Sequence, residues 1–150
     1  MAVGAFTFYQ KYRRNFGRQV INLAGGHHRM ALFTSASNAA TATLSTYASV
    51  TNEVSQANGY TTGGGTKGLL TQTWTAGASA GQYRYNSNSR VWTATGGSIS
   101  NAKFVVVYYS ATSGSKYLIC YSQMSTAQFT ITVGNTLTVT PSATGIFNLA

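Results

Sequence analysis

The feature that most constrains the fold is an unbroken run of β-branched and aromatic residues at 104–109, Phe-Val-Val-Val-Tyr-Tyr. Such residues favour extended backbone, and neither glycine nor proline interrupts them. A strand that is apolar at every position has no side suited to water, so both of its faces must be covered. The run therefore predicts a central strand of a sheet with packed material on either side.

Shorter strand patterns occupy most of the remaining chain. Residues 129–133 and 136–140 alternate apolar residues with threonine, and Gly134-Asn135 between them predicts a two-residue hairpin turn. About eight to nine short strands with frequent turn signals are typical of a mainly β, single-domain antiparallel β-sandwich or barrel. The other expected strands span residues 30–33, 69–74, 82–85, 91–95, 117–121 and 146–149.

The first 24 residues follow a different pattern. An aromatic set and a basic set each recur at helical spacing, on different faces, and Gly17 is expected to end the helix. We therefore expect an N-terminal aromatic and basic arm or short helix at 1–24 and a β-sandwich body at 25–150, within one domain. The segment is either an arm that docks on another protein or a helix that covers one end of the core. The two sets are Tyr9, Tyr12 and Phe16, and Lys11, Arg14 and Arg18.

Acidic residues are almost absent. The chain has ten lysines and arginines but a single acid, Glu53, which gives a formal net charge of +9. Most of the cations therefore cannot pair with a carboxylate of the same chain. They must face water, aromatic rings, backbone carbonyls or an acidic partner.

Few side chains could support catalysis. The chain has no aspartate, so Glu53 alone cannot form the carboxylate pair of a glycosidase or complete a Ser-His-Asp triad. Cys120 lies in the apolar stretch 117–121, where a buried, inert thiol is expected. His27 and His28 lack a third metal ligand. We therefore predict a non-enzymatic protein with no catalytic residue, no metal site and no cofactor.

Membrane insertion is not expected. No apolar run approaches the ~20 residues that a spanning helix needs, and the N-terminal stretch lacks the apolar region of a signal peptide. We expect a protein that is made and kept inside a cell, or that leaves it by lysis.

Several stretches, in one order along the chain, resemble a family of small structural proteins of tailed bacteriophages. One is residues 58–64, Asn-Gly-Tyr-Thr-Thr-Gly-Gly. The resemblance covers nearly the whole chain and rests on the order of the stretches rather than on any one of them. The others are the N-terminal Phe/Tyr-Lys-x-aromatic pattern, Asn22-Leu23, Met30-Ala31-Leu32, residues 50–54, Thr73-Trp74-Thr75, residues 92–99, residues 104–109 and residues 133–139.

The resemblance implies a virion component without catalytic residues, foremost a capsid decoration (cement) protein that binds and stabilises the shell of the major capsid protein. A tail, neck or fibre accessory protein is the first alternative, and a basic nucleic-acid-binding protein the second. The expected partners are the major capsid protein or other virion proteins. We expect a homo-oligomer, with a trimer favoured, assembled into the virion in the host cytoplasm. Members of the family tend to carry several acids, so their partner surfaces do not transfer to this chain.

The candidate contact residues combine aromatic and basic side chains of the N-terminal segment with residues of later loops and strands. Tyrosine and arginine are enriched at protein interfaces, and loops on a rigid β scaffold often make contacts. No basic run is longer than two residues, which favours a protein partner over nucleic acid. The candidates are Tyr9, Lys11, Tyr12, Arg13, Arg14, Phe16, Arg18, Tyr60, Lys67 and Arg84.

Overall fold

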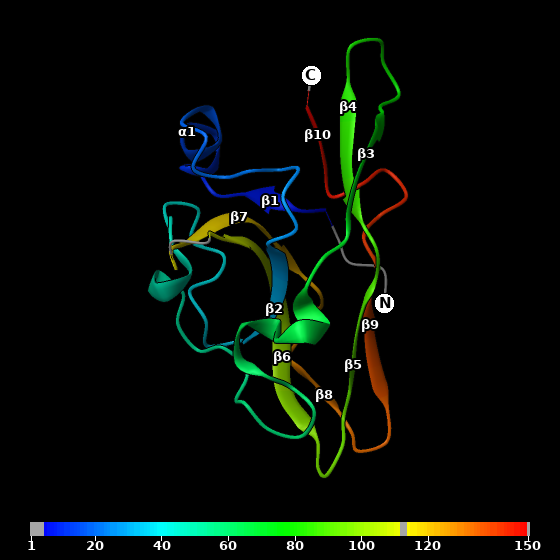
Figure 1. Ribbon diagram of the computed structural model, residues 1–150. Coiled ribbons are helices and arrows are strands. Elements are labelled where there is room, and N and C mark those ends of the chain that lie inside the picture. Colours follow the sequence, from blue (N-terminus) through cyan, green and yellow to red (C-terminus); the bar gives the residue numbers. More distant parts are fainter. Residues whose placement is uncertain (1–4, 112–113, 150) are drawn as a thin grey trace.

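The computed structural model describes residues 5–111 and 114–149 of the 150-residue chain. Within these ranges the protein is mainly β and antiparallel, as predicted, with ten strands and one short α-helix (Figure 1). The elements are β1 (Thr7–Phe8), α1 (Tyr12–Gly17), β2 (His28–Thr34), η1 (Tyr47–Ser49), η2 (Thr62–Gly64), η3 (Thr66–Gly68), β3 (Gln72–Ala76), β4 (Tyr83–Ser87), β5 (Arg90–Thr93), β6 (Ile99–Ser110), β7 (Lys116–Gln123), β8 (Phe129–Ile131), β9 (Thr136–Val139) and β10 (Phe147–Leu149).

The twelve-residue strand β6 organises the fold. It lies in a five-stranded sheet with the order β1-β7-β6-β2, and β8 also pairs with it. Two smaller sheets accompany this one, β10-β4-β3 and β5-β9. Every strand pairing in the described chain is antiparallel, which agrees with the absence of alternating strands and helices in the sequence.

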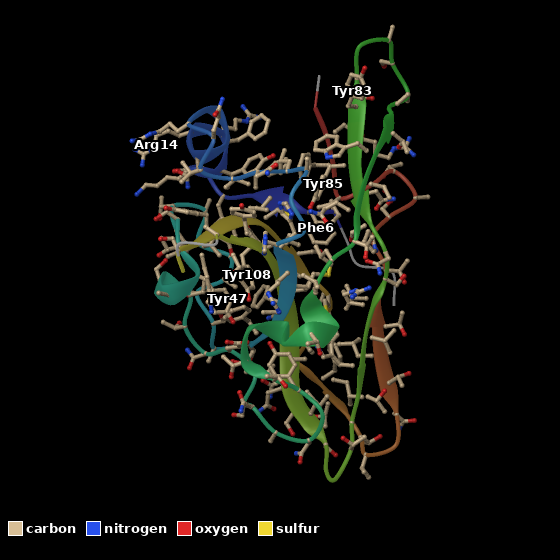
Figure 2. All side chains as sticks on the ribbon, viewed as in Figure 1. Phe6, Arg14, Tyr47, Tyr83, Tyr85 and Tyr108 are labelled. Atoms are coloured by element: carbon tan, nitrogen blue, oxygen red, sulfur yellow. The ribbon has the colours of Figure 1, made fainter. Side chains whose placement is uncertain are left out.

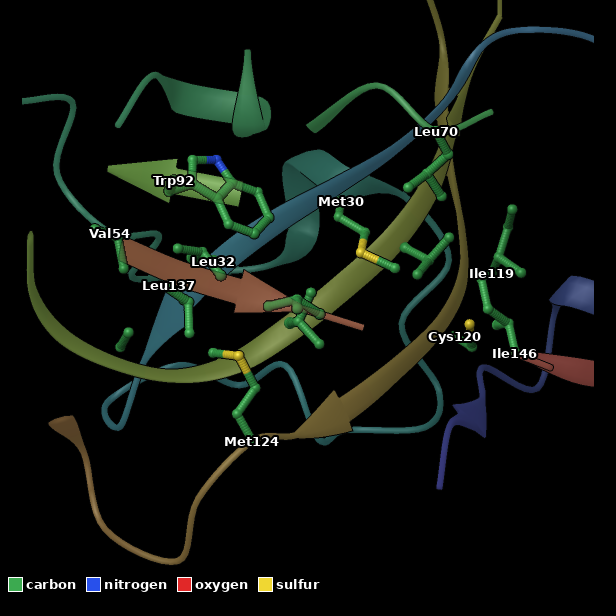
Figure 3. Packing of buried hydrophobic residues seen from close by; sticks show 14 of the residues in the cluster. Met30, Leu32, Val54, Leu70, Trp92, Ile119, Cys120, Met124, Leu137 and Ile146 are labelled. Atoms are coloured by element: carbon green, nitrogen blue, oxygen red, sulfur yellow. The ribbon is translucent and has the colours of Figure 1, made fainter. Parts of the chain in front are cut away.

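Both faces of β6 are buried, as its apolar run predicts. Because successive side chains of a strand point to opposite faces, Val105 and Val107 join one hydrophobic cluster while Val106 and Tyr108 join another. The neighbouring strand β2 divides in the same way, with Leu32 on the first face. Figure 3 shows the first cluster, in which Leu32 lies near Trp92 and Leu137 of the small sheet.

Different parts of the chain cover the two faces. The smaller sheets cover the first face with large side chains, including Tyr85 and Trp92, both fully buried. The second face is covered by the long connection after β2, which contributes Ala39 and the partly buried Tyr47. The apolar residues of this connection have no regular spacing in the sequence. Its backbone is accordingly irregular, with a 3-10 turn at η1.

The prediction of a hairpin at Gly134-Asn135 is wrong. The chain does turn there, and Gly134 has a φ of +84°. However, β8 pairs with β6, whereas β9 pairs with β5 in another sheet. The turn bonds instead to Ala94, whose carbonyl accepts from Gly134 N–H at 2.8 Å and whose N–H donates to the Asn135 carbonyl at 2.9 Å. The chain turns one residue earlier than expected, at Val133-Gly134, where the Asn135 N–H donates to the Thr132 carbonyl at 3.0 Å, and the flanking strands pair elsewhere.

The N-terminal segment packs against the body. β1 pairs with β7, placing Thr7 opposite Tyr121 and Phe8 opposite Cys120. Tyr9 is buried, and its hydroxyl donates to the Ala39 carbonyl at 2.7 Å. Residues 5–24 therefore cover one end of the core, which was one of the two interpretations that the sequence left open. The basic side chains of this segment, described below, do not take part in that packing.

Candidate functional site

Most cations of the described body are engaged within the chain. Arginines donate to backbone carbonyls and lysines lie over aromatic rings, two kinds of contact that stabilise a cation without a carboxylate. Such contacts give these side chains partners within the chain, although they leave the charges in place and Lys116 remains exposed. They are Arg29 to Gly65 O (2.6 Å), Arg84 to Ala143 O (3.0 Å), Arg90 to Ser89 O (2.8 Å), Lys103 over Phe104 (5.5 Å from Nζ to the ring centroid) and Lys116 over Tyr47 (5.1 Å).

Four other cations, Lys11, Arg13, Arg14 and Arg18, are exposed on α1 or directly beside it. Within residues 5–111 and 114–149, no hydrogen bond, ion pair or ring contact engages their head groups. Figure 2 shows Arg14 projecting away from the protein body. We call these four residues the basic helix patch.

The patch is exposed because the opposite side of α1 is anchored. Tyr12 and Asn15 are buried, and the Tyr12 ring stacks on Phe8 with centroids 4.9 Å apart. Phe147 of β10 meets the Tyr12 ring edge-on at 5.7 Å. Residues three or four apart share a helix face, so Arg14 and Arg18 are held together on the outward side.

The only carboxylate of the chain does not neutralise the patch. Glu53 accepts a hydrogen bond from the Tyr60 hydroxyl at 2.6 Å and one from the Gly63 N–H at 2.5 Å. The Tyr60 hydroxyl in turn accepts from the Leu32 N–H at 2.9 Å. Glu53 therefore fastens the glycine-rich loop to β2.

The glycine-rich loop is anchored in the core by some of its residues, while Gly59, Thr61 and Thr62 are exposed. Gly63 and Gly64 are buried, and a β-carbon at Gly64 would collide with the Met30 carbonyl. The Tyr108 hydroxyl donates to the Gly63 carbonyl at 2.9 Å. Burial and the neighbouring Glu53 raise the pKa of Tyr60, so this hydroxyl stays protonated and keeps donating.

Several candidate contact residues are corrected by the structure. Tyr9, Tyr12 and Tyr60 are core residues with exposed fractions of 1–2%, because their rings fill space between the N-terminal segment, the loops and the central sheet. Arg84 is half-buried and bound to the loop before β10. The side chain of Lys67 lies outside the described residues.

Phe16 differs from the other aromatic candidates because 38% of it is exposed. It lines a groove of about 640 Å³ between α1 and β3. No local sequence pattern indicates the other groove residues, because Trp74, which forms the opposite wall, lies 58 positions after Phe16. The remaining lining residues are Gly17, Gln19, Ile21, Asn22, Leu23 and Ala24.

Cys120 and His28 are buried, whereas His27 is exposed. Cys120 is fully buried, as predicted, and burial raises the pKa of its thiol. Burial lowers the pKa of His28 to about 4, so its imidazole is neutral at pH 7. The described residues contain no group of three or more histidine, cysteine or acidic side chains placed to hold a metal ion. Nor does this part of the chain include a helix long and apolar enough to span a bilayer.

Comparisons with protein-family models, curated proteins and solved structures give no match to this chain.

Proposed function

We propose that this chain is a non-enzymatic structural protein of a phage virion that binds an acidic surface of the major capsid protein through the basic helix patch. The proposal rests on one observation, which is that the cations fall into two groups, those with partners in the chain and those without. The body engages its own cations, whereas Lys11, Arg13, Arg14 and Arg18 are exposed together without a counter-charge in the described structure. Clustered like charges repel one another, and an acidic partner would relieve that repulsion.

The body supports a role as a shell component. Its central sheet is covered on both faces, and its glycine-rich loop is fastened by Glu53 and Tyr108. Such a body would hold the basic helix patch in a fixed position against a neighbouring protein. The virion setting itself is supported by the ordered sequence stretches that resemble small phage structural proteins.

Binding to isolated capsids tests the contact. Shells that lack this protein are incubated with the wild type, with the double variant Lys11→Gln/Arg14→Gln, or with the matched double variant Lys103→Gln/Lys116→Gln. The two variants lose the same charge, but only the first alters the basic helix patch. We expect binding to fall about 2- to 30-fold in the first variant and to stay near wild type in the second. Equal losses in both would contradict a localised contact.

Location in the particle tests the setting. Electron cryo-microscopy of the virion should show copies of this protein distributed over the head shell. A few copies confined to the tail or neck would support the accessory-protein alternative and overturn the capsid proposal. Tight binding to DNA with a steep dependence on salt, together with no binding to shells, would support the nucleic-acid alternative.

A further inference from the structure

The groove between α1 and β3 has two aromatic walls. Phe16 belongs to α1, and Trp74 belongs to β3, whose hairpin with β4 projects from the same end of the molecule as α1 (Figure 1). Ile21 and Leu23, both buried, contribute to the lining between them. The volume of about 640 Å³ is enough for a large side chain and part of the backbone that carries it.

The Trp74 wall is held in place by its neighbours. The indole N–H donates to the Leu23 carbonyl at 3.4 Å, and the ring meets Tyr85 edge-on with centroids 5.1 Å apart. Phe147 contacts the same ring edge-on at 6.2 Å. A wall fixed in this way loses little conformational freedom on binding, which favours an apolar anchor in the groove.

Two residues of the basic helix patch are neighbours of the groove lining on α1. Arg13 precedes Phe16 by three residues and Gly17 by four, so it lies on the same helix face as these two lining residues. Arg18 directly follows Gly17. None of the lining residues carries a charge. A groove with two aromatic walls, an uncharged lining that also includes Gln19 and Asn22, and cations on the helix beside it is complementary to an apolar side chain flanked by carboxylates.

From this geometry we propose that the groove binds an extended acidic segment of the partner protein, with one apolar side chain inserted between Phe16 and Trp74. This inference rests on the proposed function in taking the capsid protein as the source of that segment. A nucleic acid fits less well, because its phosphates repeat along the whole strand whereas the cations here occupy only the α1 side.

Synthetic peptides test the chemistry directly. The probe is a short peptide with a central leucine flanked on both sides by glutamates, and its control has glutamines in place of the glutamates. Binding is followed through tryptophan emission, since half-buried Trp74 lines the groove while Trp92 is fully buried. We expect the glutamate peptide to shift the emission and to bind at least about tenfold more tightly than the control. Equal binding of the two peptides would overturn the acidic part of the proposal.

A groove-filling variant tests the location. A β-carbon added at Gly17 would meet no atom within 4 Å. The same holds for Gly26, which lies outside the groove lining. Gly17→Leu should therefore obstruct the groove without straining the fold, and Gly26→Leu is its matched control. We expect peptide affinity to fall about tenfold or more in Gly17→Leu and to be unchanged in Gly26→Leu. A Gly17→Leu protein that melts like wild type and binds the peptide equally well would exclude this groove.

The same variants separate this inference from the proposed function. If Lys11→Gln/Arg14→Gln abolishes shell binding while folded Gly17→Leu retains it, the capsid contact stands and the groove inference is wrong. If neither the wild type nor any variant binds shells, but the glutamate peptide binds in the groove, the capsid proposal is wrong. The inference that the groove binds an acidic segment would then still hold. A single-stranded oligonucleotide that binds the groove more tightly than the peptide would also overturn the inference.

Discussion

His28 is a buried imidazole at the start of β2. Its Nδ1 lies 3.0 Å from the Gly25 carbonyl oxygen and 2.7 Å from the side-chain nitrogen of Gln72. Its Nε2 is buried without a hydrogen-bond partner in the described structure. Protonation would therefore place a charge and a second N–H in an environment that cannot solvate them, which is why burial lowers the pKa to about 4.

This pKa predicts acid sensitivity. The folded-state pKa of about 4 lies below the 6.5 of an ordinary histidine, so the unfolded chain binds more protons between these values. Stability should be fully present above pH 6.5 and fall by up to about 3 kcal/mol as the pH drops towards 4. Urea denaturation across this range measures the loss. His28→Asn should flatten the dependence. His27→Asn should keep most of it, because burial, and not the charge of His27, is the largest cause of the lowered pKa of His28. An unchanged slope in His28→Asn would contradict the prediction.

The bonds between Tyr60, Glu53 and Gly63 predict a strong coupling. Glu53→Gln weakens two charge-assisted hydrogen bonds, and Tyr60→Phe leaves the Leu32 N–H without its acceptor. We expect each change to lower the free energy of unfolding by about 1–3 kcal/mol. In a double-mutant cycle from urea denaturation, the two losses should be markedly less than additive, because the bond they share can be lost only once. Simple additivity would show that the bond contributes little.

At the scale of elements, the N-terminal segment combines two roles. β1 extends the central sheet, Tyr9 N–H donates to the Ile119 carbonyl at 3.1 Å, and Tyr12 packs against β10 through Phe147. The same few residues carry the basic helix patch on their outer side. The patch is therefore held in a fixed position by the burial of the aromatic side.

Deletion of residues 1–17 should therefore destabilise the whole body. It removes β1 and α1, uncovers the edge of β7 and leaves the Ala39 carbonyl without the Tyr9 hydroxyl. We expect the melting temperature to fall by more than about 10 °C, or the cooperative transition to disappear. Deletion of residues 1–4 is the control, since it leaves every described contact in place. A truncated protein that melts like wild type would show that the segment is a dispensable arm.

For the whole molecule, the shortage of acids is the dominant electrostatic fact. A net charge of +9 with one carboxylate means that folding brings cations together without many compensating pairs. Carbonyls and aromatic rings stabilise several of these cations, but the basic helix patch remains unscreened. Salt should relieve part of this repulsion, because exposed charges are screened over about 8 Å at physiological ionic strength.

The melting temperature should accordingly rise when sodium chloride is increased from low to physiological concentration, by a few degrees at most. The quadruple variant Lys11→Gln/Arg13→Gln/Arg14→Gln/Arg18→Gln should melt at or above the wild-type temperature at low salt and respond less to added salt. Calorimetry at several salt concentrations measures both effects. A quadruple variant that melts well below wild type would show that these cations stabilise the fold.

Local residue chemistry was enough to indicate most of the extended segments and the residues that must be buried. The run at 104–109 is apolar at every position, so its burial on both faces follows from local chemistry alone. Cys120 was placed in the core for the same reason. The excess of positive charge can also be read from the sequence alone, because one acid cannot pair with ten cations.

Which cations are free and which aromatic side chains are exposed depends on contacts between distant segments. Arg84 and Arg13 look alike in the sequence, yet one bonds to the Ala143 carbonyl, 59 positions away, and the other faces solvent. Tyr12 and Phe16 share one helical stripe, but Phe147 covers the first and leaves the second exposed. Turn chemistry at Gly134 is local, whereas strand pairing and side-chain burial depend on contacts between distant segments, which a local pattern cannot encode.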